Sequence, residues 1–338
     1  EDLKNRMMAE ARFLRALTYY WMVGFFGGVP LITEPYDPAE SPLVERAEAS
    51  DIWDFLIGDL KTAINELPKK SEYSGSDVAR VNKEAAKMLL AKIYMIQKNW
   101  TEAQTYVDEI RTSNEYELEE DIANNWDLET EHGKESIYEI DCGADLTYTL
   151  GRNHHNHTAP PTGRHPITGE VIPGGKWGGA MYQSIFYNSF SENDVRREKL
   201  FWDTAYYDGH IEGRYYTTKY WDFETMTKAR TGQGPVNLVY FRYADVLLMK
   251  AEIENEINDG PNAAAYTAIN RVRNRSNAPD LPADLSYDEF LVEVFDERDR
   301  EFFYEGHHWF ELKRRSFEFV ENRVETERRA FFDSVGFE

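Results

Sequence analysis

Four glutamates near the C-terminal end of the chain are the first residues whose type and spacing could do chemistry. Glu297, Glu301 and Glu305 recur at every fourth position, and Glu311 follows. Two carboxyl groups about 5–10 Å apart across a cleft can hydrolyse a glycosidic bond when one of them has a raised pKa. Because arginine charge lowers carboxylate pKa values and favours ion pairing, the interleaved arginines predict a salt-bridged helix end and no catalytic residue. These arginines are Arg298, Arg300, Arg314 and Arg315.

A histidine cluster at His154, His155 and His157, with His165 nearby, could in principle bind a metal ion. Zinc sites rely on fixed ligand spacings and a rigid support, and this stretch offers neither a helical i, i+4 pair nor a cysteine. The sequence also lacks a phosphate-binding glycine loop and the Gly-x-Ser-x-Gly and His-Glu-x-x-His motifs. We therefore expect no metal site and no cofactor, and a solvated histidine loop that touches a ligand.

Aromatic residues are the third candidate group, and they concentrate between Tyr182 and Phe223. Thirteen of these 42 residues are aromatic, about 31%, against 14% in the whole chain. Rings in loops offer flat apolar faces with polar edges, which suit the C–H face of a sugar, although most rings of a protein pack in its core. Trp177 has glycines on both sides and little around it to bury it. We predict a ligand-binding surface made by Trp177, Trp202 and Trp221, with Tyr182 and Tyr216 as secondary residues.

Helices at the N-terminal end must help to position these residues. Apolar residues recur at helical spacing over 3–26, over 52–67, and from the capping residue Asn82 to a turn at Asn99 and Trp100. Thr101 is placed to cap the next helix. The last two helices predict an αα-hairpin of the tetratricopeptide type, in which each helix pair needs a neighbour to cover its apolar face.

A second αα-hairpin is predicted near the C-terminal end. One helix carries an apolar face from Ala244 to Ala251, an Asn-Asp-Gly-Pro turn follows at 258–261, and a second apolar face runs from Ala265 to Val272. A further helix begins at Ser286, which forms a capping box with Glu289, and is expected to stop at Gly306.

Residues 114–235 differ from these helical ends. Residues 135–140 alternate like a short strand, and most of 132–179 is predicted to be loop. A connection this long is uncommon in a compact domain unless it binds something. The irregular segment is therefore the expected ligand-binding part.

Three motifs in the C-terminal helices carry a family resemblance. They are Arg-Tyr-Ala-Asp-Val-Leu-Leu at 242–248, Ile-Asn-Arg-Val-Arg at 269–273, and Glu-Arg-x-x-Glu-Phe at 297–302 followed by Glu-Gly-His-x-Trp-Phe-x-Leu at 305–312. In this order they resemble the signature of SusD/RagB-type nutrient-binding lipoproteins of the Bacteroidetes outer membrane. The family more often has Arg at the place of His308 and Asp at the place of Glu311. Phe-Gly-Gly-Val-Pro-Leu at 26–31 is similar to the family as well.

The resemblance implies a mainly α-helical, SusD-like fold with tetratricopeptide-type hairpins and a loop-rich ligand-binding segment. We expect a single domain over 1–338, with helical scaffold at 1–113 and 236–320, the aromatic-rich segment at 114–235 and a charged tail at 321–338. The implied function is non-catalytic oligosaccharide binding in polysaccharide utilisation, with delivery to a SusC-like TonB-dependent transporter. The family carries a lipid anchor before this point, so we expect a surface-exposed outer-membrane lipoprotein whose anchor and true termini lie outside this sequence.

Charge and composition exclude several partners. The chain has 61 acidic and 38 basic residues, and the net charge of −23 repels nucleic-acid phosphates and anionic lipids. Its one cysteine, Cys142, cannot form an internal disulfide, and no window approaches the ~20 apolar residues of a membrane span. Three alternatives stay open: a RagB-like protein that captures peptides, a carboxylate-dependent glycoside hydrolase, and a helical-repeat scaffold that binds only proteins.

Overall fold

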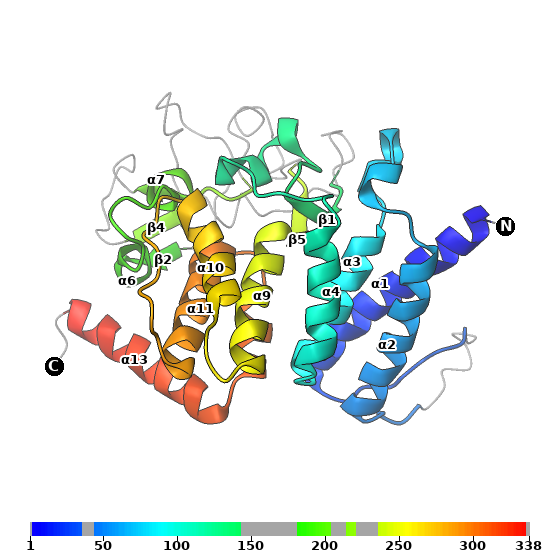
Figure 1. Cartoon of the computed structure of the whole chain (residues 1–338). Coiled ribbons are helices and arrows are strands. Elements are labelled where there is room, and N and C mark those ends of the chain that lie inside the picture. The colour runs from blue at the N-terminus through cyan, green and yellow to red at the C-terminus, as the bar shows by residue number, and fades with distance from the viewer. Residues whose placement is uncertain (1, 36–43, 143–180, 204–213, 221–235, 336–338) are drawn as a thin grey trace. The chain divides into compact units, whose positions relative to one another are not determined.

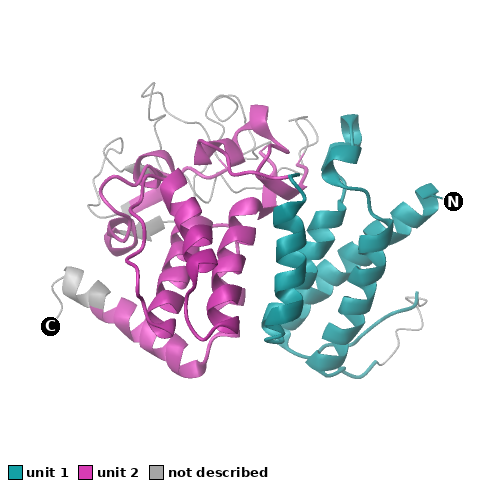
Figure 2. Cartoon of the chain, viewed as in Figure 1, with its two compact units in different colours: residues 1–115 teal, residues 116–338 magenta. Residues whose placement is uncertain are grey.

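The computed structural model describes residues 2–35, 44–142, 181–203, 214–220 and 236–335, which are mostly helical (Figure 1). They form two compact units, residues 1–115 and 116–338 (Figure 2). The division falls close to the expected boundary at 113/114 between the helical scaffold and the irregular segment. That residues 1–338 form a single domain stays a prediction.

The described residues of the first unit form four helices and two short 3₁₀ turns. The helices are α1 (Asp2–Phe26), α2 (Ala49–Glu66), α3 (Lys83–Ile96) and α4 (Trp100–Thr112), and the turns are η1 (Lys70–Glu72) and η2 (Gly75–Ala79). Consecutive helices pack against one another. Phe13, Leu56 and Leu89 are fully buried, as the helical apolar spacing predicts.

Two helix starts in this unit test the predicted caps. The Asn82 side chain accepts a hydrogen bond of 2.8 Å from the backbone N–H of Ala85, so the cap of α3 is confirmed. The Thr101 cap of α4 is wrong, because α4 begins at Trp100 and Asn99 is its N-cap residue. The carbonyl of Asn99 already accepts the first helical bond, from Ala103 N at 3.1 Å.

The second unit is built around three long helices. They are α9 (Tyr243–Ile257), α10 (Ala263–Arg275) and α11 (Tyr287–Phe302), and α9 packs on both of the others. The α9–α10 hairpin and the capping box of Ser286 and Glu289 on α11 are confirmed. The helix α11 ends at Phe302, and Gly306 lies in the following turn with a φ of 83°.

Shorter elements complete the second unit. They are η3 (Ile122–Trp126), η4 (Leu128–Thr130), α6 (Ser184–Asn188), α7 (Arg196–Lys199) and α12 (His308–Arg314), and the longer α13 (Phe317–Val335) follows them. Residues 321–338 were expected to be a charged tail, and as far as Val335 they belong to α13. Arg323 of α13 pairs with Asp296 of α11 and, one turn further along its own helix, with Glu327.

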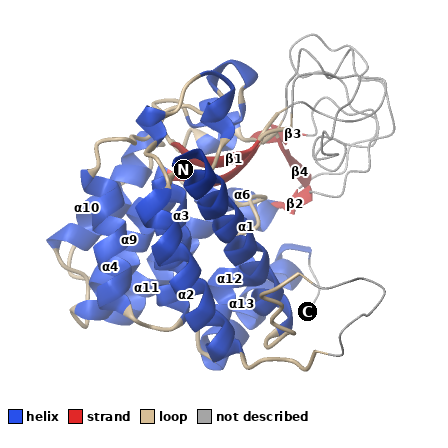
Figure 3. Cartoon of the chain, turned by 90° about the vertical axis from the view of Figure 1, so that its right-hand side faces the viewer, coloured by secondary structure: helices blue, strands red, loops and turns tan. Residues whose placement is uncertain are grey.

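Two small antiparallel sheets lie in the second unit (Figure 3). In one, β1 (Ser136–Ile140) pairs with β5 (Leu238–Arg242), which confirms the strand predicted from the alternation at 135–140. In the other, the order is β2 (Met181–Gln183), β4 (Arg214–Thr217) and β3 (Phe201–Asp203). This second sheet carries part of the aromatic segment. Every helix in the described part of the chain is too short or too polar to cross a bilayer.

Candidate functional site

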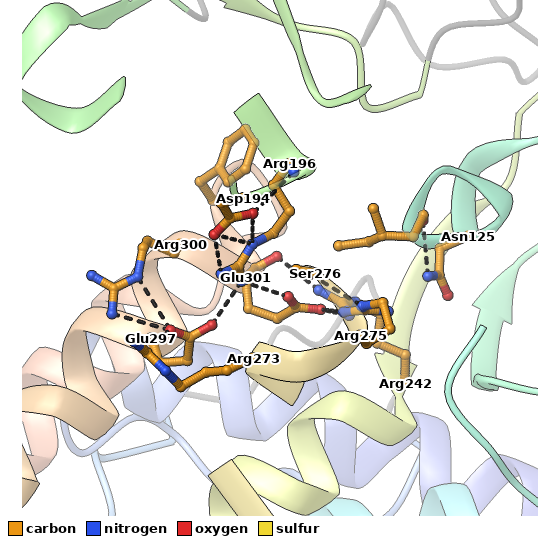
Figure 4. A network of polar contacts seen from close by, with 12 residues as sticks. Asn125, Asp194, Arg196, Arg242, Arg273, Arg275, Ser276, Glu297, Arg300 and Glu301 are labelled. Carbon is orange, nitrogen blue, oxygen red and sulfur yellow. Dashed lines mark hydrogen bonds and ion pairs between the residues drawn. The ribbon is translucent and has the colours of Figure 1, made fainter. Parts of the chain in front are cut away.

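A buried network of ion pairs joins the irregular segment to α10 and α11 (Figure 4). Arg196 lies on α7, is fully buried, and donates from Nη2 and Nε to the carboxylate of Asp194 at 2.7 and 3.0 Å. Its Nη1 donates to Glu297 at 2.8 Å and to Glu301 at 2.9 Å, both on α11. One guanidinium therefore ties a short helix of the irregular segment to the scaffold.

Each of these two glutamates has several arginine partners. Glu297 also accepts from Arg273 of α10 at 2.8 Å and from Arg300 at 3.1 Å. Glu301 also accepts from Arg242 and from Arg275. Both carboxylates are fully buried. A buried charge is costly unless it is paired and hydrogen-bonded, so this pairing is what allows the two glutamates to stay in the core.

The pKa values of these carboxyl groups follow from the same contacts. Burial would raise the pKa of Glu297, but the charges of Arg196, Arg300 and Arg273 outweigh burial and lower it to about 2. Burial likewise opposes the ionisation of Glu301, while Arg275, Arg242 and Arg196 hold its pKa well below the usual range. Neither group can serve as a protonated general acid near neutral pH.

Lys219 extends the network to the sheet of β2, β4 and β3. It lies two residues after the end of β4 and is fully buried. Its Nζ donates to the carbonyls of Glu301 and Phe303 at 2.8 and 2.9 Å and to Glu305 at 2.7 Å. Arg242 also donates to Glu305, at 2.8 and 2.9 Å. The Lys219 ammonium lies 3.9 Å from the centre of the Phe303 ring. These contacts fix the end of β4 on the last turn of α11.

A second group of buried charges involves the remaining motif residues. Arg298 donates to Asp245 at 2.7 Å and to Glu311 at 2.8 Å, and Arg314 pairs with Glu311 and Glu252. The prediction of a salt-bridged helix end is thus confirmed for all four glutamates. The motifs that carry the family resemblance supply charges to the scaffold, and none of these glutamates has the environment of a catalytic acid.

Aromatic packing supports the small sheet from one side. Phe201 of β3 stacks on Phe303 with 4.8 Å between ring centres, and Phe186 and Phe190 meet it edge to face. The ring of Tyr187 lies parallel to that of Tyr215 on β4, with 3.8 Å between centres. Such ring pairs add stability beyond the area they bury. Most of the described rings between 182 and 223 therefore pack in the interior.

The strand register shows how three predicted ligand residues lie in the backbone of this sheet. Trp202 of β3 pairs with Tyr216 of β4, and Tyr182 of β2 pairs with Tyr215. These pairings place the backbones of Trp202 and Tyr216 opposite each other in neighbouring strands. Tyr216 is 6% exposed. The structure therefore brings Trp202 and Tyr216 together, and their role in binding stays a prediction.

Several other predicted residues lie outside the described part of the chain. They are Trp177, Trp221 and the histidines His154, His155, His157 and His165. Within the residues that the structure does describe, no group of three or more His, Cys, Asp or Glu side chains is arranged to hold a metal ion. The expectation of no metal site stays a prediction for the whole chain.

Two aromatic features of the structure were not predicted from the sequence. Trp309 of α12, within the motif at 305–312, is 44% exposed. The Tyr187–Tyr215 stack, covered by Arg197 at 4.6 Å from the Tyr187 ring, was not predicted. The aromatic density of 182–223 was the only signal for it, since the two tyrosines are 28 positions apart.

Comparison with protein-family models matches both ends of the chain. Residues 203–331 match the model described as "SusD family", and residues 1–95 match the model described as "Starch-binding associating with outer membrane". The curated "SusD-like protein P25" of Formosa agariphila is 28% identical over 348 residues, which cover 93% of this chain and 64% of that protein. The chain thus spans less than two thirds of the length of this relative.

Solved structures agree with these matches. Surface glycan-binding protein A from Bacteroides uniformis has a TM-score of 0.77 and 27% identity, with 93% of this chain and 67% of that chain covered. A structure titled "Laminarin binding SusD-like protein" has a TM-score of 0.76 and 25% identity, with 93% and 71% covered. The fold that these residues adopt is therefore the fold of those proteins.

Proposed function

The chain belongs to the SusD family, and from this premise we propose that it binds an oligosaccharide at the cell surface and delivers it, unbroken, to a TonB-dependent outer-membrane transporter. The family description names starch binding and association with the outer membrane. One similar structure is titled as a laminarin-binding protein, and another as a surface glycan-binding protein. The transporter and the lipid anchor are inferred from the family alone.

The observation that carries the binding proposal is the attachment of the sheet of β2, β4 and β3. Lys219 and Arg196 fix the irregular segment to α11 through fully buried hydrogen bonds. A stacking surface binds tightly only when its rings are held in place before the ligand arrives. Trp202 and Tyr216, paired across β3 and β4, lie in the sheet that is held in this way.

We infer the absence of catalysis from the ionisation state of Glu297, Glu301 and Glu305. A glycosidase needs one carboxyl group with a raised pKa beside a second one at the bond to be broken. Here the pKa values of Glu297, Glu301 and Glu305 are all lowered, since arginine or lysine charges outweigh the effect of burial. A buried, permanently ionised glutamate cannot give a proton to a leaving group.

A glycan-array screen of the purified chain, followed by calorimetry with laminarihexaose, maltohexaose and cellohexaose, tests this function. We expect binding of at least one glycan and unchanged ligand length after prolonged incubation. Shortened products would establish the hydrolase alternative. Binding of peptides but of no glycan would establish the RagB-like alternative, and capture of folded proteins alone would establish the scaffold alternative.

A further inference from the structure

The second unit contains a cavity of about 510 Å³, within the range of roughly 300–1,000 Å³ that is typical of small-molecule sites. Its wall is formed by α6, the C-terminal half of α11, the turn after it, α12 and α13. The structure describes sixteen residues that line it. Tyr216, whose side chain the structure describes, is not among these lining residues.

Aromatic side chains form the apolar part of this cavity. They are Phe186, Phe302, Phe303 and Tyr304. Phe303 is held rigidly, because it stacks on Phe201 at 4.8 Å and meets Phe186 edge to face at 5.5 Å. Tyr304 has a φ of 64°, a backbone conformation that is uncommon for a bulky residue and that places it on the cavity wall. Phe302 and Phe303 are buried, and cationic side chains already lie over their rings, so the partly exposed Phe186 and Tyr304 are the rings that can face a sugar.

Charged side chains line the polar part of the cavity, and ion pairs connect them to one another. His308 Nδ1 lies 2.6 Å from the Asp299 carboxylate, and Arg323 lies 3.5 Å from Asp299. Arg323 also pairs with Asp296, and with Glu327 at 2.6 Å. The hydrogen bond that His308 donates to the Asp299 carboxylate raises the pKa of His308, and burial raises the pKa of Asp299. These ion pairs hold several donors and acceptors at one wall.

The charge balance of the cavity indicates the kind of ligand. Each charged lining residue has an oppositely charged partner within 4 Å, and this holds for Asp296, Arg298, Asp299, Arg300, His307, His308, Glu311, Arg323 and Glu327. An anion or a cation would therefore meet no uncompensated charge. Hydroxyl groups, in contrast, can both donate to paired carboxylates and accept from paired arginines.

We propose that this cavity is a second saccharide-binding site, which takes one or two units of a neutral sugar in addition to the ligand site predicted from the sequence. Phe186 and Tyr304 contact the C–H face of the sugar ring, and the ion-paired wall binds its hydroxyl groups. The choice of a sugar as ligand rests on the proposed function, whereas the position of the site rests on the cavity alone.

Filling the cavity tests this proposal. Ser189 is exposed, lines the cavity, and donates from its hydroxyl to the carbonyl of Phe186 at 2.7 Å. Ser189→Trp places a large side chain in the cavity, and Ser189→Ala removes the same hydrogen bond without filling it. Asn188→Trp adds the same bulk at a neighbouring exposed position outside the cavity lining. Saturation-transfer NMR with laminaribiose, cellobiose and maltose measures disaccharide binding to each variant.

We expect at least one disaccharide to bind the wild type, and Ser189→Trp to weaken that binding at least tenfold while Ser189→Ala and Asn188→Trp retain it. Equal binding by Ser189→Trp would overturn the second site, as would binding of hexasaccharides without binding of any disaccharide. If Ser189→Trp does not fold, His308→Ala replaces it as the test of the cavity, because this substitution removes a half-exposed polar group of the cavity wall. Lack of binding to every glycan, hexasaccharides included, would instead contradict the proposed function.

Discussion

Arg196 and Glu297 are joined by a hydrogen bond of 2.8 Å although they lie 101 positions apart, and both side chains are fully buried. The pair connects α7, within the irregular segment, to α11 of the scaffold. Lys219 makes the equivalent connection from the end of β4 to the carbonyls at the end of α11. The parts of the chain proposed to bind a ligand therefore depend on the same buried charges that stabilise the second unit.

Replacing Glu301 by Gln should destabilise the protein without removing any enzymatic activity. Three arginines would lose their shared carboxylate, and breaking a buried charge pair costs about 3–5 kcal/mol. Urea unfolding measures the loss, and Glu318→Gln at an exposed position of α13 is the control. A glycan turnover that disappears in Glu301→Gln would contradict the non-catalytic function.

Acid should destabilise the protein through Glu297. Its pKa falls from 4.5 to about 2 on folding, since arginine charges outweigh burial. The stability that ionised Glu297 contributes is therefore present above about pH 4.5 and is lost as the pH falls towards 2. We expect a loss on the order of 3 kcal/mol from this group between about pH 5 and pH 2. The urea midpoint as a function of pH measures it, and Glu297→Gln should show a shallower slope. An unchanged slope in the variant would contradict this assignment.

The two asparagines at helix starts make a matched pair. The Asn82 side chain caps α3, whereas Asn99 occupies the same position of α4 and its side chain accepts no capping hydrogen bond. Asn82→Ala should cost about 1 kcal/mol, and Asn99→Ala clearly less. Thermal or urea unfolding of both variants measures the difference. Equal losses of unfolding free energy in Asn82→Ala and Asn99→Ala would mean that the capping hydrogen bond of Asn82 adds nothing to stability.

Trp177 is expected to stack on the ligand. Trp177→Ala should weaken oligosaccharide binding at least tenfold in calorimetry, because losing a stacking ring costs on the order of 1–3 kcal/mol, and should shift the Tm little. Trp202→Ala and Trp221→Ala test the same surface, and Trp309→Ala, an exposed tryptophan on α12, is the control. Wild-type affinity in Trp177→Ala would show that the ligand binds elsewhere.

A chelator should change neither the Tm nor sugar binding. The histidines at 154–157 have no metal-site spacing, and the described residues hold no cluster able to bind a metal ion. Calorimetry and thermal unfolding before and after EDTA treatment measure both quantities. A drop that added Ca²⁺ or Zn²⁺ reverses would identify a cation site.

The local features of the fold could be predicted from the sequence. The helices α1, α2, α3, α9 and α10, the capping box of Ser286 and Glu289, and the strand at 136–140 follow from apolar spacing and from contacts between residues three or four positions apart. The ion pairing of Glu297 and Glu301 was predictable too, because arginines are interleaved with them.

The partners of those glutamates were decided only by the tertiary structure. Sequence spacing indicates neighbours on one helix, such as Arg300 for Glu297, but the buried oxygens of Glu301 are satisfied by Arg196, Arg242 and Arg275 from other elements. The sheet of β2, β4 and β3 was equally unpredictable, because strands of three or four residues are too short to show a period. Its place on the scaffold depends on Lys219, whose burial requires three partners that only the folded chain brings together.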